Sequence, residues 1–266
     1  IVRSTLAGLP VKWLEQKEQL GTGHAVLQAL PAVPPEHLVL VLYGDVPLTS
    51  VVTLRRLIAA ADDHTMGLLT AHIKDPTGYG RIIRNAQGEV IAVVEQADAS
   101  AAQHEIKEIN TGMLVVKAGF LRKWVMALSN KNSQGEFYLT DVIAMAVKDN
   151  VPIKTVYPAD VAEIMGVNNK AQLAELERVF QRQNAARLLE HGVTLVDPAR
   201  LDVRGEIAAG SDVIIDVNVV FEGHVRLGND VTIGANCYLR DAAIGDGTVI
   251  LPNSVIEGAE IGEACR

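Results

Sequence analysis

The chain has 266 residues, of which 48% are hydrophobic and 4% aromatic, and it carries a formal net charge of −8. An acidic chain without a basic stripe argues against nucleic acid or a membrane surface as its partner. No apolar run reaches the roughly 18–20 residues of a membrane span, and no signal peptide opens the chain. The two cysteines form neither a disulfide framework nor a metal-binding spacing. We expect a cytoplasmic protein of one large domain or two ordinary ones.

Neither end of the sequence resembles the natural end of a protein. Residue 1 is isoleucine, and the last residues, 261–266, break off inside a repeat. We therefore expect the chain to be a fragment of a longer protein.

Residues 1–168 alternate between strand and helix patterns. The predicted strands are 11–15, 37–43, 66–73, 81–84, 89–95, 110–117 and 152–157. The predicted helices are 22–30, 50–62, 118–128 and 138–149. Residues 85–88 read as a hairpin turn between two short strands. The pattern predicts an α/β domain with a mainly parallel sheet and an antiparallel insertion.

The segment 37–45 carries the strongest signal in this domain. Its branched and apolar residues predict a strand buried on both faces, and the strand stops at Gly44 and Asp45. Ligands of open α/β sheets bind just past such strand ends, where a carboxylate beside a glycine suits a metal-bound phosphate. Asp45 also fits a simple turn into the helix near Ser50.

Two glycine-containing loops follow a similar logic. Between Gln16 and the helix at 22–30, Gly21 and Gly23 flank Thr22, so that the backbone can approach a flat or anionic ligand, and the Gln16 amide suits a pyrimidine edge. In residues 75–81, Gly80 allows a sugar or phosphate to approach the main chain. Each loop alone also fits an ordinary tight turn.

Three further polar groups end or begin secondary-structure elements. Glu95 ends a strand, Asn110 begins one, and Asn168 and Asn169 close the first domain. Carboxylates and amides suit sugar hydroxyls. Taken one at a time, however, Glu95 also fits a solvated surface residue, Asn110 a turn, and one of Asn168 and Asn169 a helix cap. No nucleophile elbow, reactive cysteine or zinc spacing occurs in the sequence.

Residues 169–192 read as a linker helix between two domains. Asn169 is placed to cap it, with Gln172 three residues later as in a capping box, and Gly192 suits its C-terminal end. An apolar stripe is expected on one face, formed by Leu173, Leu176, Val179, Phe180, Leu188 and Leu189.

From residue 203 the hydrophobic period becomes six. One register holds Val203, Ala209, Ile215, Phe221, Leu227, Ile233 and Leu239, and restarts one residue early at Ile244 and again at Ile261. A second register holds Ile207, Val213, Val219, Val225, Val231, Cys237 and Ala243. This hexapeptide period predicts a parallel β-helix over residues 193–266, with Cys237 as a small core residue.

Six motifs in order carry a family resemblance. They are Gln-x-x-Gln-Leu-Gly-Thr-Gly-His-Ala, Tyr-Gly-Asp-Val-Pro-Leu, Asp-Pro-Thr-Gly-Tyr-Gly-Arg-Ile, Glu-Ile-Asn-Thr-Gly, Gly-Glu-Phe-Tyr-Leu-Thr-Asp and Gly-Val-Asn-Asn. With the linker helix and the repeats, they resemble the bifunctional bacterial N-acetylglucosamine-1-phosphate uridylyltransferase/glucosamine-1-phosphate N-acetyltransferase family. The resemblance implies a Rossmann-like nucleotidyltransferase domain followed by a left-handed parallel β-helix that assembles as a homotrimer. It also implies a role in UDP-N-acetylglucosamine synthesis for the cell wall.

The resemblance assigns roles to individual residues. It implies that Gln16, Gly21 and Thr22 hold the uracil and ribose of UTP. It places Tyr43, Gly44 and Asp45 at the nucleotide–sugar junction, and Gly80, Glu95 and Asn110 against N-acetylglucosamine 1-phosphate. Asp45 and Asn168 would coordinate Mg²⁺, and Asn168 would also contact substrate. The role of Gln19 is less defined.

The sequence departs from the family at both ends. The family's glycine-rich nucleotide loop and phosphate-binding lysine lie near its amino terminus and do not occur in this chain, and its acetyltransferase histidine and acetyl-CoA contacts would lie past Arg266. We expect this chain alone to be inactive in both reactions. Two other interpretations remain: another sugar-1-phosphate nucleotidyltransferase, such as a glucose-1-phosphate adenylyl- or thymidylyltransferase, and a non-catalytic trimerising β-helix module.

Overall fold

The computed structural model describes residues 2–266. Its internal contacts divide the chain into two compact units, one ending at Gly166 and the other spanning Val167–Arg266. Among the described residues, no helix combines the length and the apolar character that a membrane crossing requires.

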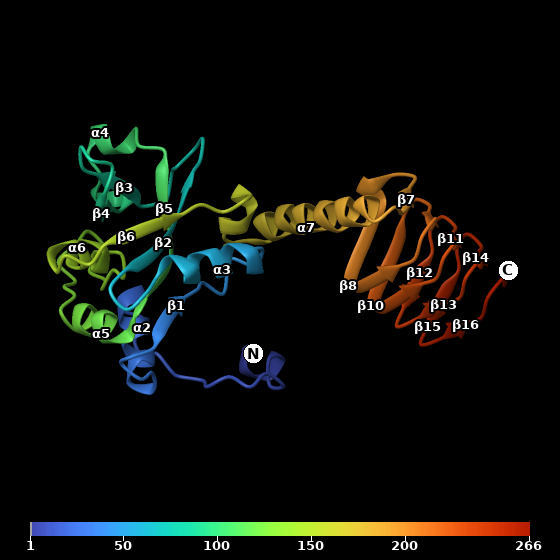
Figure 1. Cartoon of the computed structure of the whole chain (residues 1–266), viewed down its shortest axis with the longest axis horizontal. Helices are drawn as coiled ribbons and strands as arrows, with labels where there is room; N and C mark the ends of the chain where they lie inside the picture. Colours follow the sequence, from blue (N-terminus) through green and yellow to red (C-terminus); the bar gives the residue numbers. More distant parts are fainter. Residues whose placement is uncertain (1) are drawn as a thin grey trace. The chain divides into compact units, whose positions relative to one another are not determined.

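The first unit contains six strands and six helices of the α class among its described residues (Figure 1). The strands are β1 (Leu38–Val41), β2 (Met66–His72), β3 (Arg81–Arg84), β4 (Val90–Val94), β5 (Glu108–Lys117) and β6 (Ile153–Val156). The helices are α1 (Val2–Thr5), α2 (Thr22–Ala29), α3 (Val51–Ala60), α4 (Ala101–His104), α5 (Ala118–Met126) and α6 (Asp141–Lys148). A 3₁₀ helix, Val161–Ile164, follows β6.

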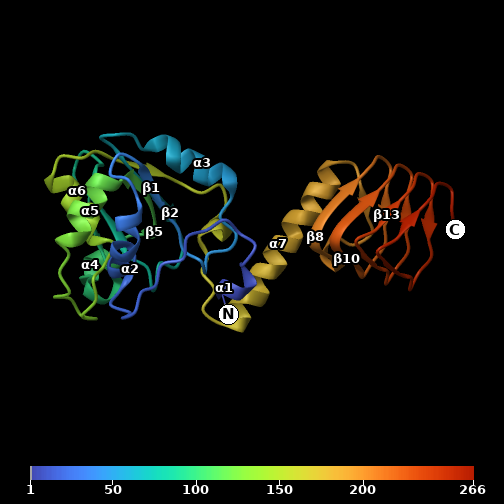
Figure 2. The same cartoon turned by 90° about the horizontal axis from the view of Figure 1, so that it is seen from below.

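The six strands form one sheet between two apolar layers. Alternate side chains of β2 and β5 point to opposite faces, as the strand period of two requires. Leu68 and Leu114 pack with α2, α5 and α6, whereas Leu69 and Val115 pack with Leu57 of α3. Figure 2 shows α3 on one side of the sheet and α5 and α6 on the other. The end of this sheet where β4 ends and β5 begins carries the candidate site.

The strand directions differ from the mainly parallel sheet that the sequence predicts. β5 pairs antiparallel with β1, β2 and β3, and among the described strands of this unit only β2 and β6 pair in parallel. β1 is also not buried on both faces, because none of its four residues is fully buried and Leu38 is 40% exposed. Among the described strands, β1 pairs with β5 alone. The apolar run correctly marks a strand, but its neighbours and their direction depend on β5, which lies 70 residues later in the sequence.

Most other predicted elements of this unit are confirmed within a few residues. Ser50 caps α3 by accepting a hydrogen bond from the Thr53 N–H at 3.1 Å. The hairpin is confirmed by the bond from Asn85 N–H to Glu89 O and by the positive φ of Gly88. The predicted strand at 11–15 is wrong. Val11 and Leu14 are exposed there, and no described strand pairs with this segment, so its alternating pattern has no partner backbone.

The second unit begins with a long helix, α7 (Lys170–Glu190). Asn169 caps it through a bond from the Gln172 N–H, while the Gln172 side chain accepts from Asn168 rather than from the cap residue itself. Gly192 follows with φ +87°, as predicted for the C-terminal end. The expected apolar stripe is only partly right: Leu176 and Leu188 are buried, but Leu173 is 53% exposed.

A polar residue of α7 covers the first edge of the following sheet. The Gln181 amide accepts from the Val203 N–H at 2.7 Å and donates to the Val203 carbonyl at 2.9 Å. Gln181 is 3% exposed. Its side chain therefore replaces a neighbouring strand at one point, which protects an otherwise unpaired edge.

The remaining strands form the parallel β-helix that the six-residue period predicts. They are β7 (Thr194–Leu195), β8 (Leu201–Ala209), β9 (Ile214–Ile215), β10 (Val219–Leu227), β11 (Thr232–Ile233), β12 (Tyr238–Arg240), β13 (Ala243–Ile244), β14 (Val249–Ile250), β15 (Val255–Glu257) and β16 (Glu260–Ile261). Every pairing among them is parallel. Figure 1 shows β10, β12 and β15 stacked along one wall.

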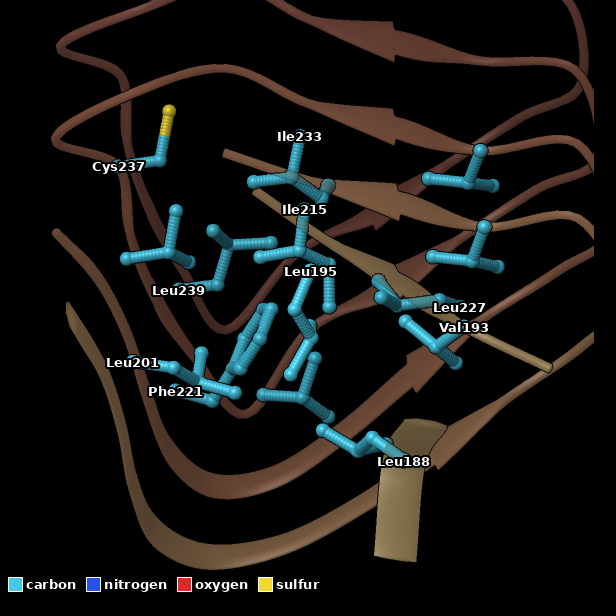
Figure 3. Close-up of a cluster of buried hydrophobic side chains, with 14 of the residues drawn as sticks. Leu188, Val193, Leu195, Leu201, Ile215, Phe221, Leu227, Ile233, Cys237 and Leu239 are labelled. Carbon is cyan, nitrogen blue, oxygen red and sulfur yellow. The ribbon is translucent and has the colours of Figure 1, made fainter. Parts of the chain in front are cut away.

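The two sequence registers become the core of this β-helix. Val203, Phe221, Leu239 and Ile256 lie at equivalent positions in successive coils. The predicted early restart is confirmed, because Ile244 pairs with Leu227 and Ile261 pairs with Ile244. Figure 3 shows labelled members of both registers, including Ile215, Ile233 and Cys237, gathered in the interior. Cys237 is 1% exposed, as expected of a core residue.

The corners of the coils are held by asparagines in the left-handed conformation. Asn218, Asn236 and Asn253 have φ values of 59°, 60° and 63°. The Asn218 amide donates to Asn236 at 2.8 Å, and the Asn236 amide donates to Asn253 at 3.2 Å. Asparagine tolerates this conformation better than other non-glycine residues, so these side chains form a ladder that links successive coils.

Candidate functional site

A cavity of about 270 Å³ opens at the end of the first unit's sheet. Its lining residues come from the start of α2, the loop after β1, the loop before β3, the end of β4, β5 and the loop before α6. They are Thr22, Tyr43, Gly78, Tyr79, Gly80, Glu95, Asn110, Thr111, Gly112, Gln134, Glu136, Tyr138 and Thr140. Five of them, Thr22, Tyr43, Gly80, Glu95 and Asn110, are site residues predicted from the sequence.

Larger cavities exist in the second unit, of about 300, 350 and 450 Å³. Their linings hold none of the site residues predicted from sequence. The cavity of the first unit is therefore the better candidate, because it unites five residues that the sequence motifs independently point to.

Glu95 lies over Gly80 on one wall of the cavity. A Cβ atom at Gly80 would lie 3.1 Å from Glu95 Oε2 and 2.9 Å from a methyl group of Val93. Only glycine leaves room for the carboxylate at this point. The Thr140 hydroxyl donates to Glu95 Oε1 at 2.8 Å and fixes its orientation.

The electrostatic setting of Glu95 is unusual for a strand-end carboxylate. Burial raises the pKa of Glu95, and the nearby negative charges of Asp141 and Asp98 raise it further, although the Thr140 bond opposes them. The pKa of Asp141 is raised as well, by burial and by Asp98. This wall is thus an acceptor surface for hydroxyl donors and a poor surface for anions.

Tyr43 forms another wall against Gly112. Its ring fills the space beside that glycine, which has φ +83°. Burial raises the pKa of the Tyr43 phenol, and the charge of Glu95 raises it further. The phenol therefore stays protonated and can donate a hydrogen bond at neutral pH.

Asn110 presents an amide to the same cavity. It is 7% exposed, and its Oδ1 accepts the Gly112 N–H at 3.1 Å. Its own backbone N–H donates to Gly80 O at 2.8 Å, which holds the start of β5 beside the loop before β3. Because Oδ1 is engaged, the two hydrogens on Nδ2 are the donors that Asn110 can offer to a ligand.

The loop before α2 docks onto the loop before α6. Gly21 has φ +104°, and a Cβ there would lie 2.8 Å from Phe137 O. The Gly23 N–H donates to the same oxygen at 2.8 Å, and Thr22 Oγ1 accepts the Leu139 N–H at 3.2 Å. These contacts place Thr22 in the cavity wall.

Gln16 and Gly21 lie beside the cavity and do not line it. Gln16 Nε2 is 3.2 Å from Gly21 O and 3.0 Å from His24 Nδ1, and Gln28 contacts the other ring nitrogen of His24. The amide of Gln16 is therefore held at the start of α2 by its neighbours.

Gly44 and Asp45 are exposed and also lie outside the cavity lining. An ideal Cβ at Gly166 would lie 4.0 Å from Asp45 Oδ2, so the last residue of the first unit lies beside this carboxylate. Asn168 is an exposed residue of the second unit. The pairing of Asp45 with Asn168 stays a prediction. Among residues 2–266, no cluster of three His, Cys, Asp or Glu side chains could hold a metal ion.

Sequence reasoning missed two kinds of residue in this region. Tyr138 and Thr140 line the cavity, although the motif 135–141 that contains them gives neither a role. Glu163 is 4% exposed and belongs to none of the sequence motifs. The spacing of Asp160 and Glu163 fits a capping box, which the structure shows, but it gives no sign that the Glu163 carboxylate is buried.

Comparisons with known proteins agree with the division into two units. Residues 2–134 match the family described as "MobA-like NTP transferase domain", and residues 210–241 match "Bacterial transferase hexapeptide (six repeats)". The chain is 56% identical over 261 residues to "Bifunctional protein GlmU" of Marinobacter nauticus, covering 98% of this chain and 58% of that protein. It is 56% identical over 265 residues to the protein of the same name from Azoarcus sp., covering 100% of this chain and 59% of the relative.

The chain thus spans less than two thirds of the length of these curated relatives. Among solved structures, a nucleotidyl transferase from Methanothermobacter matches with a TM-score of 0.44 and 19% identity, over 69% of each chain. A likeness of that strength carries no conclusion about function. The match over residues 2–134, together with the relatives, shows that the chain belongs to the MobA-like NTP transferase family and continues into bacterial transferase hexapeptide repeats.

Proposed function

We propose that the first unit binds UDP-N-acetylglucosamine, and that the whole protein makes it from UTP and N-acetylglucosamine 1-phosphate with release of pyrophosphate. The observation that carries the proposal is the meeting of Thr22, Tyr43, Gly80, Glu95 and Asn110 around one cavity. Carboxylate, amide and phenol groups on a small polar cavity suit the hydroxyl and acetamido groups of a sugar.

In this proposal, different residues of the first unit contact the sugar, the nucleoside and the phosphates of the ligand. Glu95 accepts sugar hydroxyls, Asn110 donates from Nδ2, and Gly80 lets the sugar approach the main chain. Gln16, Gly21 and Thr22 face the uracil and ribose, and Tyr43 with Gly44 lies at the junction with the phosphates. The sugar-phosphate oxygen then attacks the α-phosphorus of UTP in line, and pyrophosphate leaves, with positioning supplying much of the rate.

The proposal assigns Mg²⁺ to Asp45 and Asn168. One carboxylate and one amide suit this ion, which keeps several water ligands. Within the first unit, its last residue, Gly166, lies beside the Asp45 carboxylate. When bound, Mg²⁺ would neutralise phosphate charge that an acidic protein otherwise repels.

Binding measurements on the full-length protein test the proposal directly. We expect UDP-N-acetylglucosamine to bind more tightly with Mg²⁺ than with a chelator in titration calorimetry, and more tightly than ADP-glucose or dTDP-glucose. Equal or tighter binding of ADP-glucose or dTDP-glucose would favour another sugar-1-phosphate nucleotidyltransferase. A chain with no Mg²⁺-dependent affinity for any of the three would behave as a non-catalytic module and contradict the proposal.

We also propose a second activity and an oligomeric state for the whole protein, both based on the second unit. The relatives are named bifunctional, and the family resemblance gives the β-helix an acetyl-CoA-dependent acetylation of glucosamine 1-phosphate in the whole protein. We propose that the β-helix also assembles as a homotrimer. Apolar side chains on its surface, such as Val255 at 71% exposure, support an interface between copies. Sedimentation equilibrium at a mass other than three chains would contradict the trimer.

A further inference from the structure

Glu163 is a buried carboxylate that the proposed mechanism does not use. It lies in the 3₁₀ helix after β6 and is 4% exposed. Burying an ionised carboxylate is costly unless donors surround it. The structure supplies such donors from two separate segments of the first unit.

One carboxylate oxygen binds the segment that follows β1. Glu163 Oε2 accepts the Ser50 N–H at 3.0 Å, and the Glu163 carbonyl accepts the Thr49 hydroxyl at 2.8 Å. Ser50 is the cap of α3 and comes five residues after Asp45. The start of α3 and the end of the Asp45 loop are therefore fixed to the 3₁₀ helix.

The other oxygen binds the segment that leads into the 3₁₀ helix. Glu163 Oε1 accepts the Ala159 N–H at 3.0 Å and the Asp160 N–H at 3.3 Å. Burial raises the pKa of Glu163, but the donors of Thr53, Ser50 and Asp160 that face it lower the pKa by more. The group is thus held as a carboxylate.

This carboxylate stands between the two segments that meet at Asp45. Three residues after Glu163, Gly166 lies beside Asp45 Oδ2. The contacts of Glu163 with Ser50 and Thr49 join residues 113 and 114 positions apart in sequence.

We propose that Glu163 is a positioning residue for the metal site: it holds the Asp45 loop against residues 159–166 and so fixes the geometry in which Asp45 meets the metal ion. The inference rests on the proposed function, in which Asp45 is a metal ligand. Groups that orient metal ligands typically contribute about 10–100-fold to metal affinity.

The test is Glu163→Gln in the whole chain. The Gln amide nitrogen must face either Ser50 N–H or the Ala159 and Asp160 N–H groups, so one side of the contact is lost whichever way it turns. With UDP-N-acetylglucosamine present, we expect Mn²⁺, followed by electron paramagnetic resonance, to bind about 10-fold more weakly than to the unmodified chain. Affinity for UDP-N-acetylglucosamine under chelator should stay within about twofold, because the cavity residues are untouched.

Glu108→Gln is the matched control. Glu108 is a buried carboxylate of β5 in the same unit, 6% exposed, that binds Arg84, Thr70 and Tyr157 and does not line the cavity. It loses hydrogen bonds of a similar kind without touching the Asp45 loop. Equal weakening of Mn²⁺ binding in both variants would reduce the effect to general loosening and overturn the inference.

A second variant covers a failure of Glu163→Gln to fold. Thr49→Val removes the hydroxyl bond to the Glu163 carbonyl and leaves the carboxylate in place. We expect a smaller loss of Mn²⁺ affinity, about threefold. If Glu163→Gln folds and its Mn²⁺ affinity is unchanged, the positioning role of Glu163 is overturned. If Glu163→Gln does not fold, unchanged Mn²⁺ affinity of Thr49→Val overturns that role. Neither result affects the metal role of Asp45. Absence of Mn²⁺ binding by the unmodified chain would overturn the metal role of Asp45 as well, so the two failures are distinct.

Discussion

The ring of Tyr43 occupies the space where a side chain at Gly112 would begin. A Cβ atom built on Gly112 would lie 2.5 Å from Tyr43 Cε2 and 2.6 Å from its hydroxyl oxygen. Gly112 also has φ +83°, a conformation that disfavours any other residue. The cavity wall made by Tyr43 therefore requires glycine at this position of β5.

Gly112→Ala should both strain the backbone and displace the Tyr43 ring. We expect the free energy of unfolding to fall by about 1–3 kcal/mol, measured by urea denaturation, with loss of UDP-N-acetylglucosamine binding. The double variant Tyr43→Ala/Gly112→Ala removes the overlap but keeps the strain. It should lose less stability than the sum of the two single variants, and strict additivity would show that the ring and the Cβ do not collide.

The β-helix shows which part of a fold a sequence can specify. Three six-residue repeats make one coil of the β-helix. The two series of apolar residues that contain Val203 and Val213 therefore predict both which side chains are buried and which strands stack on one another. Both properties are local to consecutive coils. In β1 the apolar run reports only that the segment is a strand, because its single neighbour, β5, and their antiparallel pairing are set by distant residues.

The site shows the same limit. Glycines and polar groups at strand ends marked Gly80, Glu95 and Asn110, and these residues share one cavity. Thr140 could not be placed there from sequence, because its position depends on the loop before α6 folding back onto residues 20–23. The burial of Glu163 could not be predicted, because part of its contacts are with Thr49 and Ser50, more than 100 positions away.

Asp45→Ala should separate metal binding from folding. The side chain is exposed, so we expect the free energy of unfolding to change by no more than about 0.5 kcal/mol. The improvement in UDP-N-acetylglucosamine affinity on adding Mg²⁺ should disappear in calorimetry. In the full-length protein, turnover should fall by about 100-fold or more. Glu105→Gln, another exposed acid of this unit, is the control, and near-normal turnover of Asp45→Ala would remove Asp45 from the mechanism.

Glu95→Gln should make the first unit more stable at neutral pH while weakening sugar binding. Burial and the charges of Asp141 and Asp98 raise the pKa of Glu95 above its unfolded value. The stability associated with the protonated group is therefore complete below the unfolded pKa and is lost as pH rises through the folded pKa. Glutamine mimics the protonated form, so the gain in melting temperature should be present at pH 7 and absent near pH 4. A gain of equal size at both pH values would assign the effect to packing and not to charge.

The asparagine ladder of the β-helix allows backbone strain and hydrogen bonding to be measured separately at one position. Asn236 has φ +60°, accepts from Asn218 and donates to Asn253. Asn236→Ala loses both bonds and leaves a Cβ in the left-handed conformation, at a cost of about 1–2 kcal/mol from strain and about 1 kcal/mol from the bonds. Asn236→Gly loses the same bonds but relieves the strain. In urea denaturation, we expect the free energy of unfolding of the alanine variant to be about 1 kcal/mol lower than that of the glycine variant. If the two variants had equal free energies of unfolding, the asparagine side chains would stabilise the corner through their hydrogen bonds alone. The left-handed backbone conformation would then not explain why asparagine occurs at 218, 236 and 253.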